Sequence, residues 1–329
     1  MTSSDAPSPS ALSSIFTSNS RAFTMIQPTV SSGMVSMGVS PGVCLTPVLS
    51  RAGLRPVHPF LRRAPCGALI ARKREGEMAD ARTKAERLFG RVPAIGCWLD
   101  LPSPEAAEIA ALAGADFGLV DLEHGAISIE TALRMIAALR AGGAAPLARP
   151  PEATDAWAKR LLDAGAAGLI MPMIESAEAA AAAAAAMRYP PLGRRGAAAG
   201  VIAASRWGRD PVYVAGWNEA CFLAVQIESP TAVEAAAAMA AVDGVDMLFF
   251  GPNDYAYAAG LDGPDDPAVW PVLEKMVETA HAAGKLVGTV AFGRGAAALV
   301  AAGCDLVSAA SDVAALGRGI AADVAAARP

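Results

Sequence analysis

The sequence lacks the patterns that mark a disulfide scaffold, a zinc site or a membrane span. Its 329 residues include five cysteines, which are scattered and form no CxxC pair, so neither a disulfide framework nor a zinc knuckle is indicated. No apolar run approaches the roughly 20 residues that cross a bilayer, and the alanine run Ala179–Ala186 is far too short. We therefore expect a protein of the reducing cytoplasm that has no membrane partner.

Basic residues are also scarce outside the N-terminal segment. The whole chain carries a formal net charge of −5, yet residues 1–77 hold eight basic residues against three acidic ones. The remainder is therefore more acidic than the total suggests. Because phosphate binding needs a basic face, this charge argues against a nucleic acid as partner.

Residues 1–77 are rich in Ser, Pro and Arg and show no sustained helix or strand periodicity, so we do not expect them to join a packed core. Two explanations stay open. Such a composition is typical of an organelle transit peptide, which would place the protein in an organelle. Alternatively, translation starts at Met78, because the codons for Arg74 to Glu77 would be purine-rich like a ribosome-binding site. We favour the second explanation and expect residues 78–329 to form one domain.

From Ala94 onward, short apolar runs alternate with alanine-rich helical stretches. The expected strands are Ala94–Leu99, Phe117–Asp121, Ala145–Arg149, Gly168–Met171, Phe222–Ile227, Met247–Phe250, Leu286–Val290 and Leu306–Ser308. The expected helices are Pro104–Ala113, Ser128–Ala141, Thr154–Ala164, Ser176–Met187, Pro230–Ala240, Ala268–Ala283, Gly295–Ala302 and Val313–Ala326. Eight such βα units predict an α/β protein of the (β/α)₈ TIM-barrel type rather than an open doubly wound sheet.

Polar residues gather where several of these strands end. In a TIM barrel the chemistry lies at the C-terminal ends of the strands, so residues at these positions are candidates for function. They are Asp121, Glu123, His124, Arg149, Gln226, Glu228, Asn253 and Asp254. The pattern predicts an active site on one rim of the barrel.

Two of these carboxylates, Glu228 and Asp254, follow neighbouring strands. Together they could hold a divalent cation such as Mg²⁺, Mn²⁺ or Co²⁺ and leave coordination positions open for substrate. Each also has a simpler explanation, because Glu228 precedes an expected helix N-terminus and Asp254 fits an Asx-type turn. The presence of His124 and Arg149 on the same rim favours the metal site.

His124 and Arg149 are the candidate proton-transfer and anion-binding groups. Asp121 lies three residues before His124 and could orient its imidazole, an arrangement suited to proton transfer near neutral pH. The guanidinium of Arg149 could bind a carboxylate or stabilise an enolate at the barrel mouth. A structural histidine and a surface salt bridge are the respective alternatives.

The chain is also poor in lysine, and none lies where it could form a Schiff base at the rim. The five lysines are Lys73 in the leader, Lys84 before the barrel, Lys159 and Lys275 in expected helices, and Lys285 before a strand. Stabilisation of a carbanion next to a carbonyl would therefore need a metal.

Between about Ile95 and Ala326 the chain resembles the HpcH/HpaI family of class II, metal-dependent 2-oxo acid aldolases, of the 4-hydroxy-2-oxo-heptanedioate aldolase type. The resemblance rests on short motifs in a fixed order. They are Asp121-Leu122-Glu123-His124, Arg149-Pro150, Leu161-Leu162-Asp163-Ala164-Gly165, the segment from Arg188 to Gly196, Ser205-Arg206-Trp207, Gln226-Ile227-Glu228 and Gly251-Pro252-Asn253-Asp254.

The resemblance implies a role for each matching residue. It implies metal ligands at Glu228 and Asp254, and a catalytic His124 supported by Asp121. It also implies that Arg149 binds pyruvate or its enolate, that Gln226 lies near the oxo acid, and that Asp163 acts near the acceptor aldehyde. Asn253, a further substrate-binding candidate, and Tyr255 depart from the small or aliphatic residues usual there, which leaves the acceptor open. A homotrimer or homohexamer that exchanges C-terminal elements is implied as well.

The expected reaction is thus the reversible cleavage of a 4-hydroxy-2-oxo acid into pyruvate, or a close analogue, and an aldehyde. One rival is an acyl-CoA lyase of the citrate lyase β or malyl-CoA lyase type, in which the segment from Arg188 to Gly196 would bind phosphate. A rival of another class is a non-catalytic barrel that serves as a binding module. The combination of His124, Arg149, Glu228 and Asp254 argues against the second rival.

Overall fold

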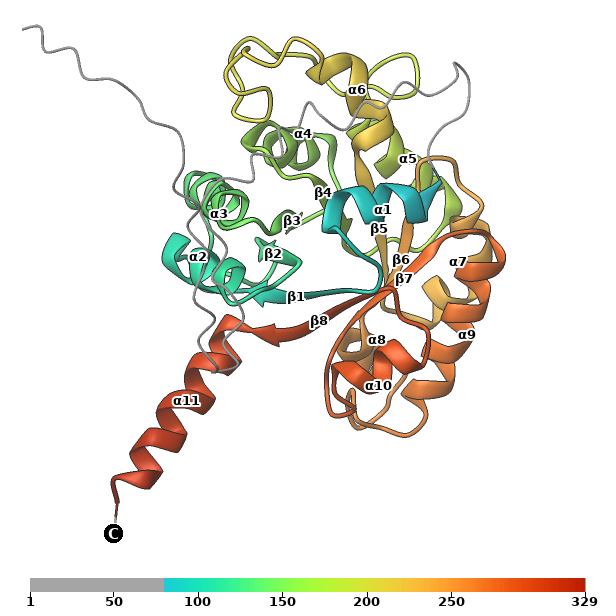
Figure 1. The fold of residues 1–329 in the computed structure, drawn as a ribbon. Helices are drawn as coiled ribbons and strands as arrows, with labels where there is room; N and C mark the ends of the chain where they lie inside the picture. The colour runs from blue at the N-terminus through green and yellow to red at the C-terminus, as the bar shows by residue number, and fades with distance from the viewer. Residues whose placement is uncertain (1–79, 329) are drawn as a thin grey trace, which may run out of the picture. The chain divides into compact units, whose positions relative to one another are not determined.

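The computed structural model describes residues 80–328, and the predicted leader, residues 1–77, lies outside them. Eight parallel strands close in chain order into a barrel, with helices around them (Figure 1). The strands are β1 (Ala94–Leu99), β2 (Phe117–Asp121), β3 (Ala145–Arg149), β4 (Gly168–Met171), β5 (Phe222–Ile227), β6 (Met247–Phe250), β7 (Leu286–Val290) and β8 (Leu306–Ser311). The prediction of a (β/α)₈ TIM barrel is confirmed.

The described helices include the eight expected ones and three more. They are α1 (Ala81–Phe89), α2 (Pro104–Leu112), α3 (Ile129–Gly142), α4 (Asp155–Ala164), α5 (Ala177–Met187), α6 (Tyr213–Ala220), α7 (Pro230–Ala240), α8 (Pro252–Ala258), α9 (Val269–Ala282), α10 (Ala296–Ala301) and α11 (Asp312–Ala326). The sequence analysis missed α1, α6 and α8. Neither α6 nor α8 has a side-chain N-cap hydrogen bond, so the usual start signal is absent from both.

Hydroxyl side chains define where most of the expected helices begin. Ser128, Thr154 and Ser176 each accept a hydrogen bond from the backbone N–H three residues further on, which satisfies a donor that the first turn leaves free. At the other end of α4, Gly165 has a φ of 107° and closes the helix toward β4, a conformation that favours glycine. These local signals explain why the helix boundaries could be read so closely from the sequence.

Apolar side chains form two packed layers. Inward-facing residues of the strands fill the barrel; they include Phe117 and Leu119 of β2 and Phe222 of β5. The outward-facing residues, such as Val120, pack against the surrounding helices. Because side chains alternate along a strand, each strand has a fixed inward set of positions.

The N-terminal ends of the strands, called the lower end here, are closed by α1. Its Ala81, Ala85 and Phe89 join the apolar filling of the barrel, and Phe89 contacts the rings of Phe117 and Phe222 edge-on. These contacts explain why a short helix ahead of β1 is ordered, since it buries its apolar face where the barrel would otherwise be open.

Three aspartates, here called the lower-end aspartates, lie directly before β2, β6 and β8 and link neighbouring strands. They are Asp116, Asp246 and Asp305. Each accepts a hydrogen bond from a backbone N–H of the preceding strand, at Ile95, Leu223 and Val287 respectively. Each also has a cation within 4.0 Å: Arg91, Lys84 and Arg82 respectively.

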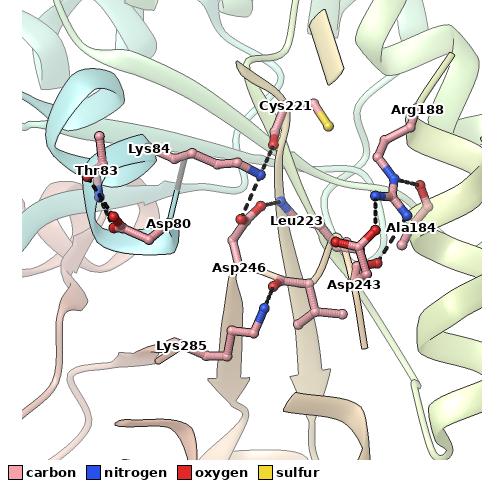
Figure 2. Close-up of polar contacts among 11 residues, drawn as sticks. Asp80, Thr83, Lys84, Ala184, Arg188, Cys221, Leu223, Asp243, Asp246 and Lys285 are labelled. Atoms are coloured by element: carbon pink, nitrogen blue, oxygen red, sulfur yellow. Dashed lines mark hydrogen bonds and ion pairs between the residues drawn. The ribbon is translucent and has the colours of Figure 1, made fainter. Parts of the chain in front are cut away.

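The Lys84–Asp246 pair is the most buried of these contacts. Lys84 Nζ lies 2.8 Å from Asp246 Oδ1, and the two side chains are only 4% and 5% exposed. Figure 2 shows the ammonium between this carboxylate and the carbonyl oxygen of Cys221, with Arg188 and Asp243 paired nearby. A paired buried charge is tolerated, whereas an unpaired one is strongly destabilising.

At the opposite end of the domain, α11 extends away from the barrel (Figure 1). None of its residues is buried, although Val313, Leu316, Ile320 and Val324 are apolar and exposed. Their spacing places them along one stripe of the helix. No helix among residues 80–328 has the length and apolar character of a membrane span.

Candidate active site

Strand alternation explains which polar side chains enter the barrel mouth. In β2 the inward positions are Phe117 and Leu119, so the next one is Asp121. The same count leads from Leu147 to Arg149 in β3 and from Ala224 to Gln226 in β5. The apolar filling of the barrel therefore ends in a polar layer at the C-terminal ends of the strands.

This layer forms the floor of a cavity of about 470 Å³, which is within the size range of small-molecule sites. Of the residues predicted to form the site, six line it: Asp121, His124, Arg149, Gln226, Asn253 and Asp254. Glu228 lies next to these lining residues and accepts a hydrogen bond from Gln226. The structure thus brings seven of the eight predicted residues to one place.

Arg149 is the most tightly held of these groups. Its Nε and Nη2 donate to the two carboxylate oxygens of Asp121 at 2.9 and 2.7 Å, and its Nη1 lies 2.7 Å from Glu123 Oε2. The guanidinium carbon also lies 4.6 Å from the ring centroid of Trp98. A planar guanidinium held by two carboxylates and one ring has a fixed orientation.

The charges follow from this arrangement. Burial opposes ionisation of both partners, but the hydrogen bonds and charge of Arg149 lower the pKa of Asp121 below its ordinary value. In return, Asp121 and then Glu123 raise the pKa of Arg149 in spite of its burial. Arg149 is therefore a permanent cation at the cavity floor.

Asp121 was expected to support His124, and the structure pairs it with Arg149 instead. Asp121 and Arg149 are register partners in β2 and β3, so both side chains point into the barrel at the same level. His124 lies beyond the end of β2, its side chain is 67% exposed, and its Nε2 is 3.8 Å from Glu123 Oε2. Glu123, which the sequence analysis placed on the rim without a role, is the carboxylate that lies beside the imidazole.

Gln226 of β5 and Glu228, which directly follows that strand, lie on another side of the site. Glu228 accepts a hydrogen bond from Met173 N at 2.7 Å and a second one from the amide of Gln226. Burial, and then the charges of Asp254 and Glu123, raise the pKa of Glu228 above its ordinary value. Gln226 Oε1 is buried and has no hydrogen-bond partner among the described residues.

Gly251 at the end of β6 keeps this side of the site open. A Cβ at this position would lie 3.1 Å from Glu228 Cβ and 3.2 Å from Gln226 Nε2, closer than the neighbouring atoms allow without movement. The glycine therefore lets the β5 side chains and the first turn of α8, which carries Asn253 and Asp254, approach one another.

Among residues 80–328 no group of three or more His, Cys, Asp or Glu side chains is arranged to hold a metal ion. The predicted pair of ligands, Glu228 and Asp254, numbers only two. Their charges nevertheless act on each other, because Asp254 contributes to the raised pKa of Glu228. Such a pair, beside the unpartnered Gln226 Oε1, is an oxygen donor set of the kind that hard divalent cations prefer.

Asp163 is the predicted site residue that the structure does not bring to the cavity. It lies in α4, and its Oδ1 accepts a 2.7 Å hydrogen bond from Arg195 Nη2. Arg195 is itself buried against the rings of Tyr189 and Trp217. Asp163 therefore faces the segment between α5 and α6 instead of the cavity of its own chain.

The cavity also contains residues that the sequence analysis did not single out. Trp98 is an inward residue of β1 and Asp100 directly follows that strand, while Ser308, Ser311 and Arg318 line the wall formed by β8 and α11. Asp100 could have been found by the rule applied to the other strands, because it directly follows the end of β1.

Comparison with known proteins identifies the family. Residues 94–317 match the model of the HpcH/HpaI aldolase/citrate lyase family. The 2-keto-3-deoxy-L-rhamnonate aldolase of Klebsiella pneumoniae subsp. pneumoniae is 42% identical over 200 residues, which are 60% of this chain and 74% of that protein. The enzyme of the same name from Salmonella typhi is 39% identical over 207 residues, which are 63% and 78% of the two chains.

Solved structures agree with this match. An HpcH/HpaI aldolase/citrate lyase family protein from Burkholderia cenocepacia J2315 superposes with a TM-score of 0.69 at 32% identity, covering 75% of this chain and 99% of that one. The predicted family and the predicted enzyme class, a carbon–carbon lyase of the aldolase kind that acts on a 2-oxo acid, are confirmed. The two relatives named above carry the 2-keto-3-deoxy-L-rhamnonate name, so the 4-hydroxy-2-oxo-heptanedioate subtype stays a prediction. The chain belongs to the HpcH/HpaI aldolase/citrate lyase family.

Proposed function

We propose that this chain cleaves a 4-hydroxy-2-oxo acid reversibly into pyruvate, or a close analogue, and an aldehyde with the help of a divalent metal ion. The observation that carries the proposal is the fixed cation of Arg149 at the floor of a cavity whose wall holds Asp254, with Glu228 beside it. An anion-binding group and a carboxylate pair on one rim are what a metal-dependent aldolase needs.

Glu228 and Asp254 would hold the metal ion. Their repulsion in the absence of a cation, and the unpartnered Gln226 Oε1, fit that assignment. When bound, the metal supplies the positive charge that makes the carbonyl of the oxo acid electrophilic. Mg²⁺, Mn²⁺ and Co²⁺ are the candidate ions.

Arg149 binds the oxo acid and stabilises negative charge as the carbon–carbon bond breaks. Its Nε and Nη2 are held by Asp121 and its Nη1 by Glu123. The positive charge is therefore in position before the substrate arrives. Gln226 and Asn253, which line the same cavity, supply further polar contacts to the same acid. Asp121 acts by fixing Arg149.

His124 takes the proton from the C4 hydroxyl during cleavage and returns it in the aldol direction. Its exposure at the mouth of the cavity lets the ring move toward the substrate. Glu123 is the neighbouring carboxylate, with its Oε2 3.8 Å from the Nε2 of the ring.

The chain assembles as a homotrimer or homohexamer through α11. The apolar stripe of this helix supports the proposal, because four exposed apolar side chains on one helix are better covered by another subunit than by water. The role of Asp163 near the aldehyde depends on such an assembly, since in its own chain this residue faces away from the cavity.

The acyl-CoA lyase alternative loses its main support. The three arginines that were considered for phosphate binding are each paired with a carboxylate of the same chain: Arg188 with Asp243, Arg194 with Asp155 and Arg195 with Asp163. Arg188 and Arg195 are buried in these pairs, so only the exposed Arg194 could reach a nucleotide phosphate. We further propose that the protein works in the cytoplasm, because its described cysteines, Cys97, Cys221 and Cys304, are unpaired.

A pyruvate-release assay tests the proposal. A panel of 4-hydroxy-2-oxo acids is offered to the purified chain with EDTA, Mg²⁺, Mn²⁺ or Co²⁺. We expect metal-stimulated release that falls more than about 10³-fold in Glu228→Gln and in Asp254→Asn, while Glu152→Gln, an exposed carboxylate at the same rim, keeps the parent rate. Parent-level, EDTA-sensitive turnover in either site variant would refute the ligand assignment.

A further inference from the structure

We infer that Asp100 recognises a hydroxyl group on the acceptor aldehyde, next to the aldehyde carbon. The inference rests on the proposed aldol reaction and concerns the half of the substrate that does not become pyruvate. It starts from a carboxylate that lines the cavity and has no assigned task.

The position of Asp100 follows from strand geometry. Trp98 is an inward residue of β1, so the next inward position is Asp100, and its side chain lines the same cavity as Arg149 and His124. Its backbone is fixed from outside, because Asp312 accepts hydrogen bonds from the N–H groups of Asp100 and Leu101, both at 3.0 Å. The carboxylate is thus held on a rigid strand end.

Asp100 has a side-chain hydrogen-bond contact with Asp121 but no cation of its own, so its carboxylate retains acceptor capacity for a ligand. No cation among the described residues lies within salt-bridge distance of it, whereas Asp121 and Glu123 both contact Arg149. The groups that face it are Asp121 of β2, Asp312 of α11, Arg149 of β3 and Cys97 of β1. Burial, followed by the charges of Asp121 and Asp312, raises the pKa of Asp100 to about 6.

Barrel order indicates which part of the substrate it meets. In a closed eight-stranded barrel, β1 lies across from β5. The oxo acid is assigned to Arg149 of β3 and to Gln226 and Glu228 at the end of β5, so the far end of an extended substrate points toward β8 and its neighbour β1. The wall there consists of Asp100 with the small residues Ser308, Ala309, Ala310 and Ser311.

A carboxylate in this place selects for hydroxyl groups. An ionised carboxylate accepts a strong hydrogen bond from a hydroxyl. If it faced an alkyl group instead, it would lose its hydrogen bonds to water and gain none from the substrate. An acceptor that carries a hydroxyl is therefore preferred over the alkyl aldehyde of the same length.

The test runs the reaction in the aldol direction with pyruvate, metal and either 2-hydroxypropanal or propanal. The measured quantity is the ratio of the two kcat/KM values. In the parent we expect the hydroxyaldehyde to be favoured, and in Asp100→Ala we expect this ratio to fall about 10- to 100-fold, the worth of a hydrogen bond to a charged group. Asp100→Asn, which retains an acceptor oxygen without the charge, should lie between.

Two further readouts separate recognition from a structural role. The preference of the parent should increase between pH 5 and pH 8, as the carboxyl ionises, and that of Asp100→Asn should not. Glu152→Ala, which removes an exposed carboxylate at the same rim, should keep the parent ratio.

The outcomes are distinct. If Asp100→Ala slows both aldehydes equally, or the ratio is unchanged, Asp100 does not recognise the hydroxyl. If the parent condenses neither aldehyde with pyruvate and releases no pyruvate from any 4-hydroxy-2-oxo acid, the proposed function itself fails.

Discussion

The two ends of the barrel use carboxylates in opposite ways. Each lower-end aspartate accepts a hydrogen bond from one backbone N–H and is paired with a cation of its own. Asp246, for example, accepts from Leu223 N and is paired with Lys84. At the upper end, Asp121 and Glu123 share the single guanidinium of Arg149, while Asp100 lacks a cation within salt-bridge distance among the described residues. Burial, together with these neighbours, raises the pKa of Asp100, Glu123 and Glu228.

This difference separates stability from function. Carboxylates that are fully partnered inside the chain have nothing left to offer a ligand, and even so burial raises the pKa of Asp246 above its ordinary value against the charge of Lys84. Carboxylates that are crowded and under-compensated raise the free energy of the folded state, and a cation or substrate can lower it again. The variants below sharpen or break this contrast.

The largest expected effect is at the upper end and distinguishes His124 from Arg149. His124→Ala should slow aldol cleavage about 10²–10⁴-fold, the usual contribution of a positioned general base. Metal-dependent exchange of the pyruvate methyl protons with D₂O should be less impaired in His124→Ala than in Arg149→Ala, because exchange depends on stabilising negative charge.

Arg149→Lys serves as the control, since it keeps a cation between Asp121 and Glu123 while losing the bidentate geometry. Its melting temperature shows whether loss of exchange reflects a damaged fold. Equal loss of exchange in His124→Ala and in a well-folded Arg149 variant would mean that one group serves both proton transfers.

The fold was predictable because its signals are local. Alternating apolar runs and hydroxyl N-caps mark the strands and most helices, and the main strand difference is that β8 continues to Ser311 instead of ending at Ser308. The helix α1 was missed because its reason for forming is not local. It is held by the barrel filling around Phe89 and by Lys84 reaching Asp246, 162 residues further along the chain.

The site was predictable as a set of residues and less so as a set of contacts. Strand ends identified Asp121, Arg149 and Gln226, because the alternation of side chains along each strand is enough to place them on the inward face. Sequence spacing suggested an Asp121–His124 pair, but strand register places Asp121 against Arg149. The position of Asp163 depends on packing against Arg195 from a distant loop, which spacing along the chain does not encode.

At the lower end, Lys84→Met should reduce the free energy of unfolding by about 3–5 kcal/mol, because it leaves Asp246 buried with an uncompensated charge. Chemical denaturation measures the loss. Lys275→Met, which changes an exposed lysine of α9, is the matched control and should be nearly neutral. Below the unfolding transition, kcat/KM should stay close to that of the parent, and an activity loss without a stability loss would contradict the division between the two ends.

The smallest expected effect is a gain in stability instead of a loss. Asp100→Asn should stabilise the metal-free protein at neutral pH. Burial and the neighbouring carboxylates raise the pKa of Asp100 from 3.8 to about 6, so the folded protein binds this proton more tightly than the unfolded chain. The stability from that proton is fully present below about pH 4 and is lost as the pH rises through about 6. Since Asp100 is only half-buried, solvent screening limits the effect to about 1 kcal/mol, or roughly 2–4 °C in Tm. Melting curves of the parent and Asp100→Asn should therefore coincide near pH 4 and separate by pH 7.5, with the variant higher. A constant offset at all pH values, or a lower Tm for the variant at pH 7.5, would show that the upper-end carboxylates are as well compensated as those at the lower end.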